Sequence, residues 1–144
     1  GPTATPELLE KYPLLLSDYH TSKAYNASWL RNVPYLRQVE PDPTLHIHPD
    51  TAKARGIKDG DWVVVEGPHG WIKLKALYYP GIRPDTVMAL HGWWQGCSEL
   101  GLEDMPLTDG GANTNNMYTT DPAKMFDPLV TAMSSQTLVQ VRKA

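Results

Sequence analysis

Two neighbouring runs of alternating hydrophobic residues constrain the fold of this chain most. Residues 62–66 (Trp-Val-Val-Val-Glu) are rich in β-branched side chains, which fit a pleated sheet. Residues 67–70 (Gly-Pro-His-Gly) supply a tight connection, and residues 71–78 alternate between apolar and polar side chains. One side of the second run is formed by Ile72, Leu74 and Ala76. The pattern predicts a β-hairpin with one buried face.

The rest of the chain is predicted to form short strands and turns around this hairpin. Four more strands are expected at 14–16, 45–48, 86–90 and 137–141, and short helical pieces at 6–11, 28–32 and 121–126. Asp50 is expected to cap a further helix over 51–55, which Gly56 closes. Thirteen prolines and eleven glycines in 144 residues favour turns over long helices. We therefore expect a mainly β domain with one or two short helices and long loops.

The length of the chain suits one compact domain. Residues 1–13 are predicted to be a polar connector, and residues 14–144 the domain itself. Because the chain opens in a connector and without a methionine, we expect a piece excised from a longer protein or a processed chain.

Composition excludes several classes of function. Residues 84–141 carry a charge of about −6 and the remaining lysines are scattered, whereas a nucleic-acid binder would show a basic stripe. No apolar run is long enough to span a membrane, so no direct membrane insertion is expected. Cys97 is the only cysteine, which rules out an intrachain disulfide and leaves the cellular compartment undetermined.

A long polar segment, residues 91–118, is the strongest candidate for a functional loop. Connections of this length inside a compact domain are usually functional or disordered, and its tryptophans and asparagines argue against plain disorder. Asparagine side chains both donate and accept hydrogen bonds, so the Asn113–Asn116 region could bind the edge of a heterocycle. From spacing alone, asparagines in a glycine-rich loop are more simply explained by their tolerance of turns.

Several motifs together resemble one known family. Residues 47–66 combine a strand, a proline, an acidic residue, Gly-Ile, Asp-Gly-Asp and a valine-rich strand. The matching motifs are Gly70, Pro80-Gly81-Ile82, His91-Gly92-Trp93-Trp94, Gly111-Ala112-Asn113-Thr114-Asn115 and Asp127-Pro128, with Thr21-Ser22 in an early loop. This set is similar to the molybdopterin dinucleotide-binding, carboxy-terminal domain of the dimethyl sulfoxide reductase family of molybdenum and tungsten oxidoreductases. The resemblance spans about residues 14–142 and implies a double-psi β-barrel of the aspartate decarboxylase type.

The resemblance also implies what such a chain does. It would bind part of a molybdopterin guanine dinucleotide that carries molybdenum or tungsten in a large catalytic subunit. Its partners would be the other domains of that subunit and an iron–sulfur subunit. Because the reactive chemistry belongs to the cofactor, we predict no catalytic residue in this chain. The isolated domain is expected to be inactive and to lack the cofactor.

The residues expected to contact the cofactor follow from the matched motifs. They are Thr21, Ser22, His91, Gly92, Trp93, Asn113 and Asn115. Hydroxyls at Thr21 and Ser22 suit a pyrophosphate, and His91 suits the pterin or a phosphate. Of Trp93 and Trp94, one is expected to face the cofactor and the other to pack. Asp104, Asp109 and Asp121 are expected to be solvated.

Other interpretations remain open at this point. His46 and His48 alternate in a predicted strand and would share a face, but no third metal ligand is evident, so no metal site is predicted. A self-processing aspartate decarboxylase would need a Gly-Ser bond, which the chain lacks. The alternatives are a non-enzymatic double-psi binding module and a small separate subunit of a tungsten formylmethanofuran dehydrogenase-like complex.

Overall fold

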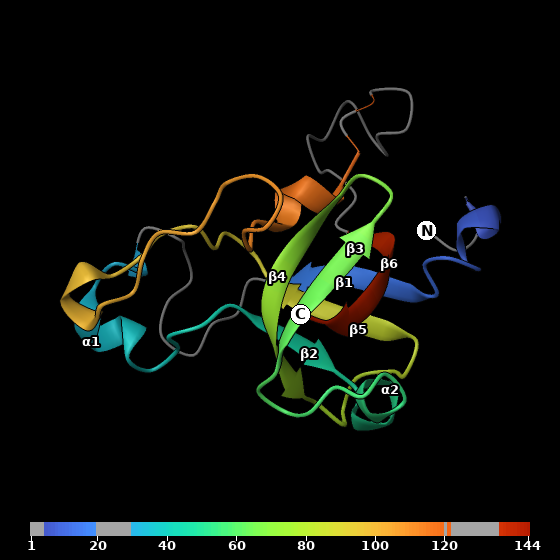
Figure 1. Cartoon of the computed structure of the whole chain (residues 1–144), viewed down its shortest axis with the longest axis horizontal. Helices are drawn as coiled ribbons and strands as arrows, with labels where there is room; N and C mark the ends of the chain where they lie inside the picture. The colour runs from blue at the N-terminus through green and yellow to red at the C-terminus, as the bar shows by residue number, and fades with distance from the viewer. Residues whose placement is uncertain (1–4, 20–29, 120, 122–135) are drawn as a thin grey trace.

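The computed structural model describes residues 5–19, 30–119, 121 and 136–144, and its described strands close into a barrel (Figure 1). The strands are β1 (Leu14–Tyr19), β2 (Thr44–Ile47), β3 (Trp62–Gly67), β4 (Gly70–Tyr78), β5 (Thr86–Leu90) and β6 (Gln136–Lys143). Their order around the barrel is β1-β5-β2-β4-β3-β6. The pairs β1–β5 and β2–β4 are parallel, and the other four are antiparallel. The predicted mainly β barrel is confirmed.

The hairpin of β3 and β4 forms as the alternation predicted. Val65 pairs with Ile72, and Gly67 pairs with Gly70 at the turn. Ile72, Leu74 and Ala76 all point into the core, while Trp71 and Lys73, which alternate with them, are exposed. The buried side chains of the other strands complete the core, so the barrel encloses one continuous apolar interior.

Helix α2 (Pro49–Lys53) begins earlier than predicted and has a different cap. The N-cap is His48, whose Nδ1 accepts a hydrogen bond from the backbone N–H of Asp50 at 3.2 Å. Proline is favoured in the first helical turn because it has no N–H to satisfy there, so Pro49 starts the helix directly after the strand. Gly56 and Gly60 adopt φ angles of 67° and 84°, in agreement with their predicted turn positions.

The predicted strand at 45–48 is therefore wrong at its end. β2 stops at Ile47, and His48 caps the helix, so His46 and His48 do not share a strand face. His46 instead lies stacked between the rings of Tyr19 and Tyr79, with ring centroids 4.7 and 4.8 Å away. The two histidines are two positions apart in the sequence, but His46 belongs to β2 and His48 to the cap of α2.

The remaining elements are short. They are helix α1 (Pro34–Arg37) and the 3₁₀ turns η1 (Pro6–Leu8), η3 (Ser98–Leu100) and η4 (Thr114–Met117). α1 was missed from the sequence, and the predicted helix at 6–11 is reduced to η1. The predicted helical piece at 121–126, apart from Asp121, and most of the early loop lie outside the described residues. In the part of the chain that the structure describes, every helix is too short or too polar to cross a lipid bilayer.

Candidate functional site

The segments that follow β1 and β5 leave the barrel at one end, which we call the loop end. β1 and β5 run parallel, with Tyr19 opposite Leu90, so the segments after both strands start side by side. The backbone N–H of His91 donates to the carbonyl of Tyr19 at 3.3 Å. The β3–β4 turn lies at the same end, because β3 and β6 are antiparallel and β6 is antiparallel to β1. Helix α2 lies at the opposite end (Figure 1).

Two of the predicted cofactor motifs meet at the loop end. Trp93 pairs with Ala112 as an isolated antiparallel β-bridge, so the segment from His91 to Trp94 lies against the segment from Gly111 to Asn115. The second segment is also tied to the barrel, because the carbonyl of Gly111 accepts a hydrogen bond from the backbone N–H of Lys73 on β4 at 2.8 Å. The structure thus places side by side the two motifs that contain five of the seven residues predicted to contact the cofactor. The other two, Thr21 and Ser22, lie outside the described residues.

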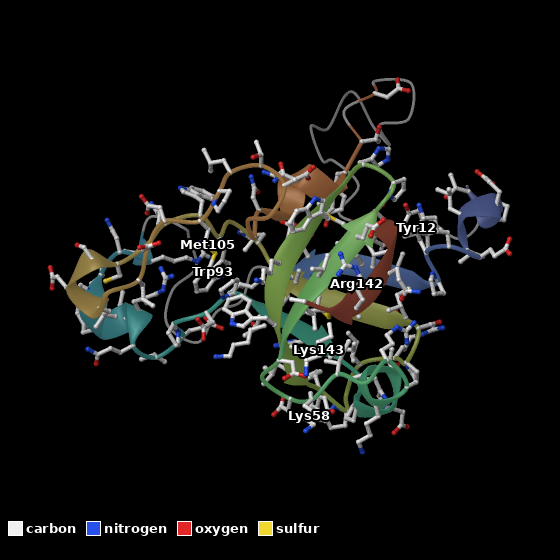
Figure 2. The ribbon with its side chains drawn as sticks, in the orientation of Figure 1. Tyr12, Lys58, Trp93, Met105, Arg142 and Lys143 are labelled. Carbon is white, nitrogen blue, oxygen red and sulfur yellow. The ribbon has the colours of Figure 1, made fainter. Side chains whose placement is uncertain are left out.

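The two neighbouring tryptophans have different environments. Trp93 is fully buried and belongs to the core, and Met105 packs near it (Figure 2). The guanidinium groups of Arg31 and Arg37 lie over its indole, at 4.7 and 4.6 Å from the ring centroid. Trp94 is only partly buried, and its carbonyl accepts from the N–H of Met105 at 2.7 Å. Trp93 is therefore the packing member of the pair.

The asparagine loop is built largely by its own side chains. Asn113 caps η4, with its Oδ1 accepting from the N–H of Asn115 at 3.2 Å and its Nδ2 donating to the carbonyl of Leu107 at 3.3 Å. Asn116 Nδ2 donates to the same carbonyl at 2.8 Å. Asn115 is exposed, and its side chain makes no hydrogen bond to the described residues. Of the three amides, that of Asn115 is the most available to a ligand.

A hollow of about 630 Å³ lies beside this loop. It is lined by His69, Thr108, Asp109, Asn115, Asn116, Tyr118, Thr119 and Asp121. The β3–β4 turn supplies His69, and Gly70 permits the close approach of Asn116, whose carbonyl would lie 2.7 Å from a Cβ at that position. Burial raises the pKa of the Tyr118 phenol, and the negative charge of Asp18 raises it further. The phenol is therefore neutral across the physiological range.

Asp104 and Asp109 are exposed, as predicted, and each also accepts a backbone hydrogen bond. Asp109 Oδ1 accepts from the backbone N–H of Trp71 at 3.2 Å, which ties the asparagine loop to β4. Asp104 Oδ1 accepts from the N–H of Gly96 at 2.6 Å. Both carboxylates satisfy backbone donors, one at the start of β4 and one in the irregular segment around Gly96. The spacing of residues in the sequence did not predict either of these hydrogen bonds.

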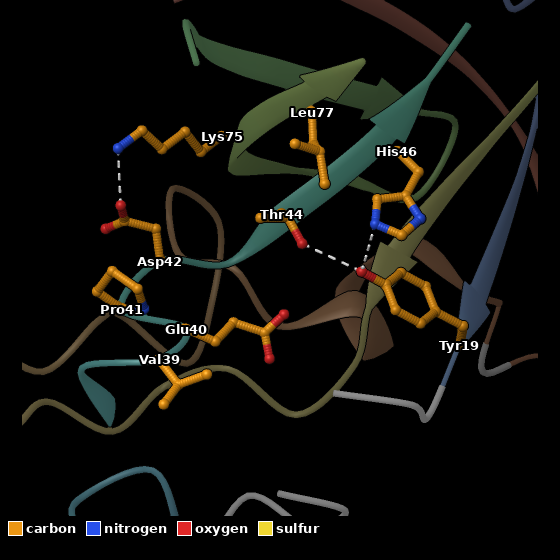
Figure 3. Close-up of a pocket in the computed structure, with 9 residues that line it drawn as sticks. All are labelled: Tyr19, Val39, Glu40, Pro41, Asp42, Thr44, His46, Lys75 and Leu77. Atoms are coloured by element: carbon orange, nitrogen blue, oxygen red, sulfur yellow. Dashed lines mark hydrogen bonds and ion pairs between the residues drawn. The ribbon is translucent and has the colours of Figure 1, made fainter. Parts of the chain in front are cut away.

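A second hollow, of about 210 Å³, was not predicted from the sequence (Figure 3). The Tyr19 hydroxyl lies 3.1 Å from both Thr44 Oγ1 and His46 Nε2. Burial raises the pKa of Tyr19, although its hydrogen bond with Thr44 opposes this. Lys75 and Asp42 form an ion pair at 2.7 Å on the other wall. Within the described ranges, no group of three or more potential metal ligands occurs here or elsewhere.

Comparison with known proteins identifies the family. The family model described as "Molydopterin dinucleotide binding domain" matches residues 14–130. The chain belongs to this family. It is the type of domain found in catalytic subunits of molybdopterin oxidoreductases related to dimethyl sulfoxide reductase.

Individual relatives agree with this assignment. The formate dehydrogenase 2 subunit alpha (cytochrome c-553) of Nitratidesulfovibrio vulgaris is 33% identical over 93% of this chain. The acetylene hydratase of Syntrophotalea acetylenica is 38% identical over 62% of this chain. The solved structure of acetylene hydratase from Pelobacter acetylenicus covers the whole chain with a TM-score of 0.82 and 27% identity.

This molybdopterin dinucleotide-binding domain is a small part of each relative. The chain spans 13% of the formate dehydrogenase subunit, 12% of the acetylene hydratase and 20% of the solved chain. The matched proteins therefore contain further domains.

Proposed function

We propose that this domain forms one wall of the binding site for a molybdopterin guanine dinucleotide, with molybdenum or tungsten, in a larger oxidoreductase subunit. The observation that carries the proposal is the Trp93–Ala112 bridge, which unites two family motifs above the parallel ends of β1 and β5. The bound group would supply the redox chemistry through the metal held by its dithiolene. The chain would bind and orient it.

The loop end fits the chemistry of such a ligand. Guanine and the pterin share a pyrimidine edge that carries both hydrogen-bond donors and acceptors. The hollow of about 630 Å³ offers amides at Asn115 and Asn116, hydroxyls at Thr108 and Thr119, and a carboxylate at Asp121. A carboxylate accepts from ring N–H and amino groups but repels phosphate. We therefore assign this hollow to a heterocycle and place the pyrophosphate elsewhere.

The predicted contact residues then take distinct roles. Asn115 would bind the ring edge through its available amide, and Asn113 would hold the shape of the loop while contacting the ligand. His91 and Gly92 stand where β5 ends, and Gly92 has a φ of 74°, which allows the backbone to turn toward a ligand there. Trp93 would act through its backbone, because its ring is buried. Thr21 and Ser22 are proposed to bind the pyrophosphate.

The partners are proposed to be the remaining domains of the same subunit and an iron–sulfur subunit. Large apolar side chains are exposed on the segments that leave the loop end: Tyr35, Val39 and Leu107, at 72%, 56% and 59%. Such side chains favour burial against another surface. An iron–sulfur cluster needs several cysteines, and this chain has one. Alone, the domain is proposed to be inactive.

Nucleotide binding by the full chain tests the proposal. We would record amide spectra of ¹⁵N-labelled chain during titration with GDP, and with CDP and ADP for comparison. GDP should shift the resonances of Asn115, His69 and His91, and the N115A variant should weaken that effect. Lys58→Ala, at the α2 end, is the matched control. Shifts confined to the α2 end, or no shifts with any nucleotide, would refute the proposed function.

A further inference from the structure

Two buried arginines hold the residues that the proposed function assigns to the cofactor. Arg31 and Arg37 are each 1% exposed, which is unusual for side chains that remain charged at any physiological pH. Their guanidinium groups lie near the indole of Trp93, at 4.7 and 4.6 Å from its centroid. Stacking of guanidinium planes on an indole is favourable and strengthens when water is excluded. We call Arg31, Trp93 and Arg37 the arginine clamp.

The clamp also contacts the backbone of the loop end. Arg31 donates from Nη2 to the carbonyl of His91 at 2.8 Å and from Nη1 to the carbonyl of Gly92. Arg37 donates from Nη1 to the carbonyl of Gln95 at 2.7 Å. The segment from His91 to Gln95 is thus held at three carbonyls by two side chains. Because a peptide unit is planar, fixing a carbonyl also fixes the direction of the N–H in the same unit.

Arg37 connects the two long segments to each other. Besides Gln95, it donates to the carbonyl of Arg31 at 3.0 Å and to that of Pro41 at 2.9 Å. Cys97 Sγ lies 3.7 Å from the carbonyl of Asn32, between the same two segments. One guanidinium therefore satisfies carbonyls of both long segments, and these carbonyls have no sheet or helix partners. Lysine could not do this, because its ammonium has no rigid fork of donors.

We propose that Arg31 and Arg37 are positioning residues that hold the His91–Gln95 segment in its ligand-binding conformation. With only 1% of each residue exposed, they offer almost no surface to a ligand, and they act through Trp93 and the three carbonyls. This inference rests on the proposed function for the identity of the ligand. Its structural content, the immobilisation of residues 91–95, can be measured without any ligand.

Hydrogen exchange of the full chain tests the clamp directly. We would compare Arg31→Ala and Arg37→Ala with Val65→Ala, a buried substitution in β3 of the barrel core that lies outside residues 91–97 and should lower global stability. Amides of residues 91–97 should exchange at least tenfold faster in both arginine variants, while β3 and β4 keep their protection. In V65A, the excess exchange should appear in the barrel and not be concentrated at 91–97. Equal behaviour of the three variants would overturn the proposal and leave a purely stabilising role.

Conservative variants keep the test decisive if an alanine variant fails to fold. Arg31→Lys retains the charge but cannot bridge two carbonyls while stacked, so residues 91–97 should still lose protection. Trp93→Phe keeps an aromatic ring and should show a smaller loss. Wild-type exchange at 91–97 in R31K would contradict the clamp.

Ligand binding then separates this inference from the proposed function. The Kd for GDP should rise at least tenfold in R31A and R37A and stay within about twofold in V65A. If the wild-type chain binds no GDP, the proposed function fails, whereas the exchange result still decides the clamp. If GDP binds the arginine variants as tightly as the wild type, the positioning role is wrong even though the proposed function stands.

Discussion

Trp93 and Ala112 face each other across an antiparallel bridge, and both side chains are fully buried. The bridge makes two segments that are distant in the sequence into one surface. The approach is tight nearby, because a Cβ on Gly111 would lie 1.8 Å from the carbonyl oxygen of Pro106. The geometry of the bridge thus depends on the absence of a side chain at Gly111.

Gly111→Ala should therefore disturb the loop end. The clash is with backbone, which cannot rotate away as a side chain can, so we expect a loss of about 1–3 kcal/mol, as for other overpacked sites. Gly81→Ala is the control, because its Cβ would meet only the ring of Tyr79 at 3.3 Å. Urea unfolding of both variants measures the difference. A G111A variant as stable as G81A would show that the loop relaxes freely.

A cavity in the barrel core should lower the free energy of unfolding. Leu74 is fully buried in β4 and belongs to the central cluster. Leu74→Ala should lower the free energy of unfolding by about 2–5 kcal/mol. Lys73→Ala, on the exposed face of the same strand, should change it by less than about 0.5 kcal/mol. Similar losses in the two variants would contradict the assignment of inner and outer faces.

Substitutions at His48, the N-cap of α2, should lower stability by different amounts. His48→Ala removes the acceptor for the Asp50 N–H and should cost about 0.5–2 kcal/mol. His48→Asn, which retains a side-chain acceptor, should recover most of that stability. Thermal unfolding of the two variants provides the measurement. If H48N is no more stable than H48A, the cap contributes little and the helix is held by its packing.

Acid stability should depend on Asp61. The pKa of its carboxyl is lowered, first by the hydrogen bond from the Lys58 N–H at 3.0 Å and then by Lys143 at 3.1 Å. A depressed pKa in the folded state gives stability that is present above the unfolded value of about 3.9 and is lost as pH falls through the folded pKa. Asp61→Asn should flatten the acid side of a stability–pH curve from urea unfolding. Lys143→Ala should flatten it less, and the reverse order would be inconsistent with the geometry.

The sequence predicted local elements well and long-range contacts poorly. The hairpin of β3 and β4 and the glycine turns at Gly56 and Gly60 were identified because alternation and positive-φ turns leave a direct trace in neighbouring residues. α1 was missed although Pro34 marks its first turn, because four residues carry almost no periodicity.

For the candidate site, too, the sequence predicted local motifs but few of the long-range contacts. The motifs around His91 and Asn113 were predicted to act together, and the bridge confirms that they are adjacent. The arginine clamp was missed, because no local pattern marks Arg31 and Arg37 as buried and both contact residues about 60 positions away. No local pattern reveals which arginine will stack on which tryptophan.

Substitutions at the adjacent residues Asn115 and Asn116 should separate an effect on ligand binding from an effect on stability. Asn115 is exposed at the hollow and makes no side-chain hydrogen bond to the described residues, whereas Asn116 Nδ2 donates to the carbonyl of Leu107 at 2.8 Å. Asn115→Ala should leave the free energy of unfolding within about 0.5 kcal/mol of wild type. It should raise the Kd for GDP about tenfold, because a lost hydrogen bond of roughly 1.4 kcal/mol corresponds to that factor.

Asn116→Ala should lower stability by about 1 kcal/mol, since the carbonyl of Leu107 loses its shorter donor. Calorimetric titration and urea unfolding of both variants give the two readouts, and a loss of GDP affinity in N116A but not in N115A would reverse the assignment of the ligand-binding amide.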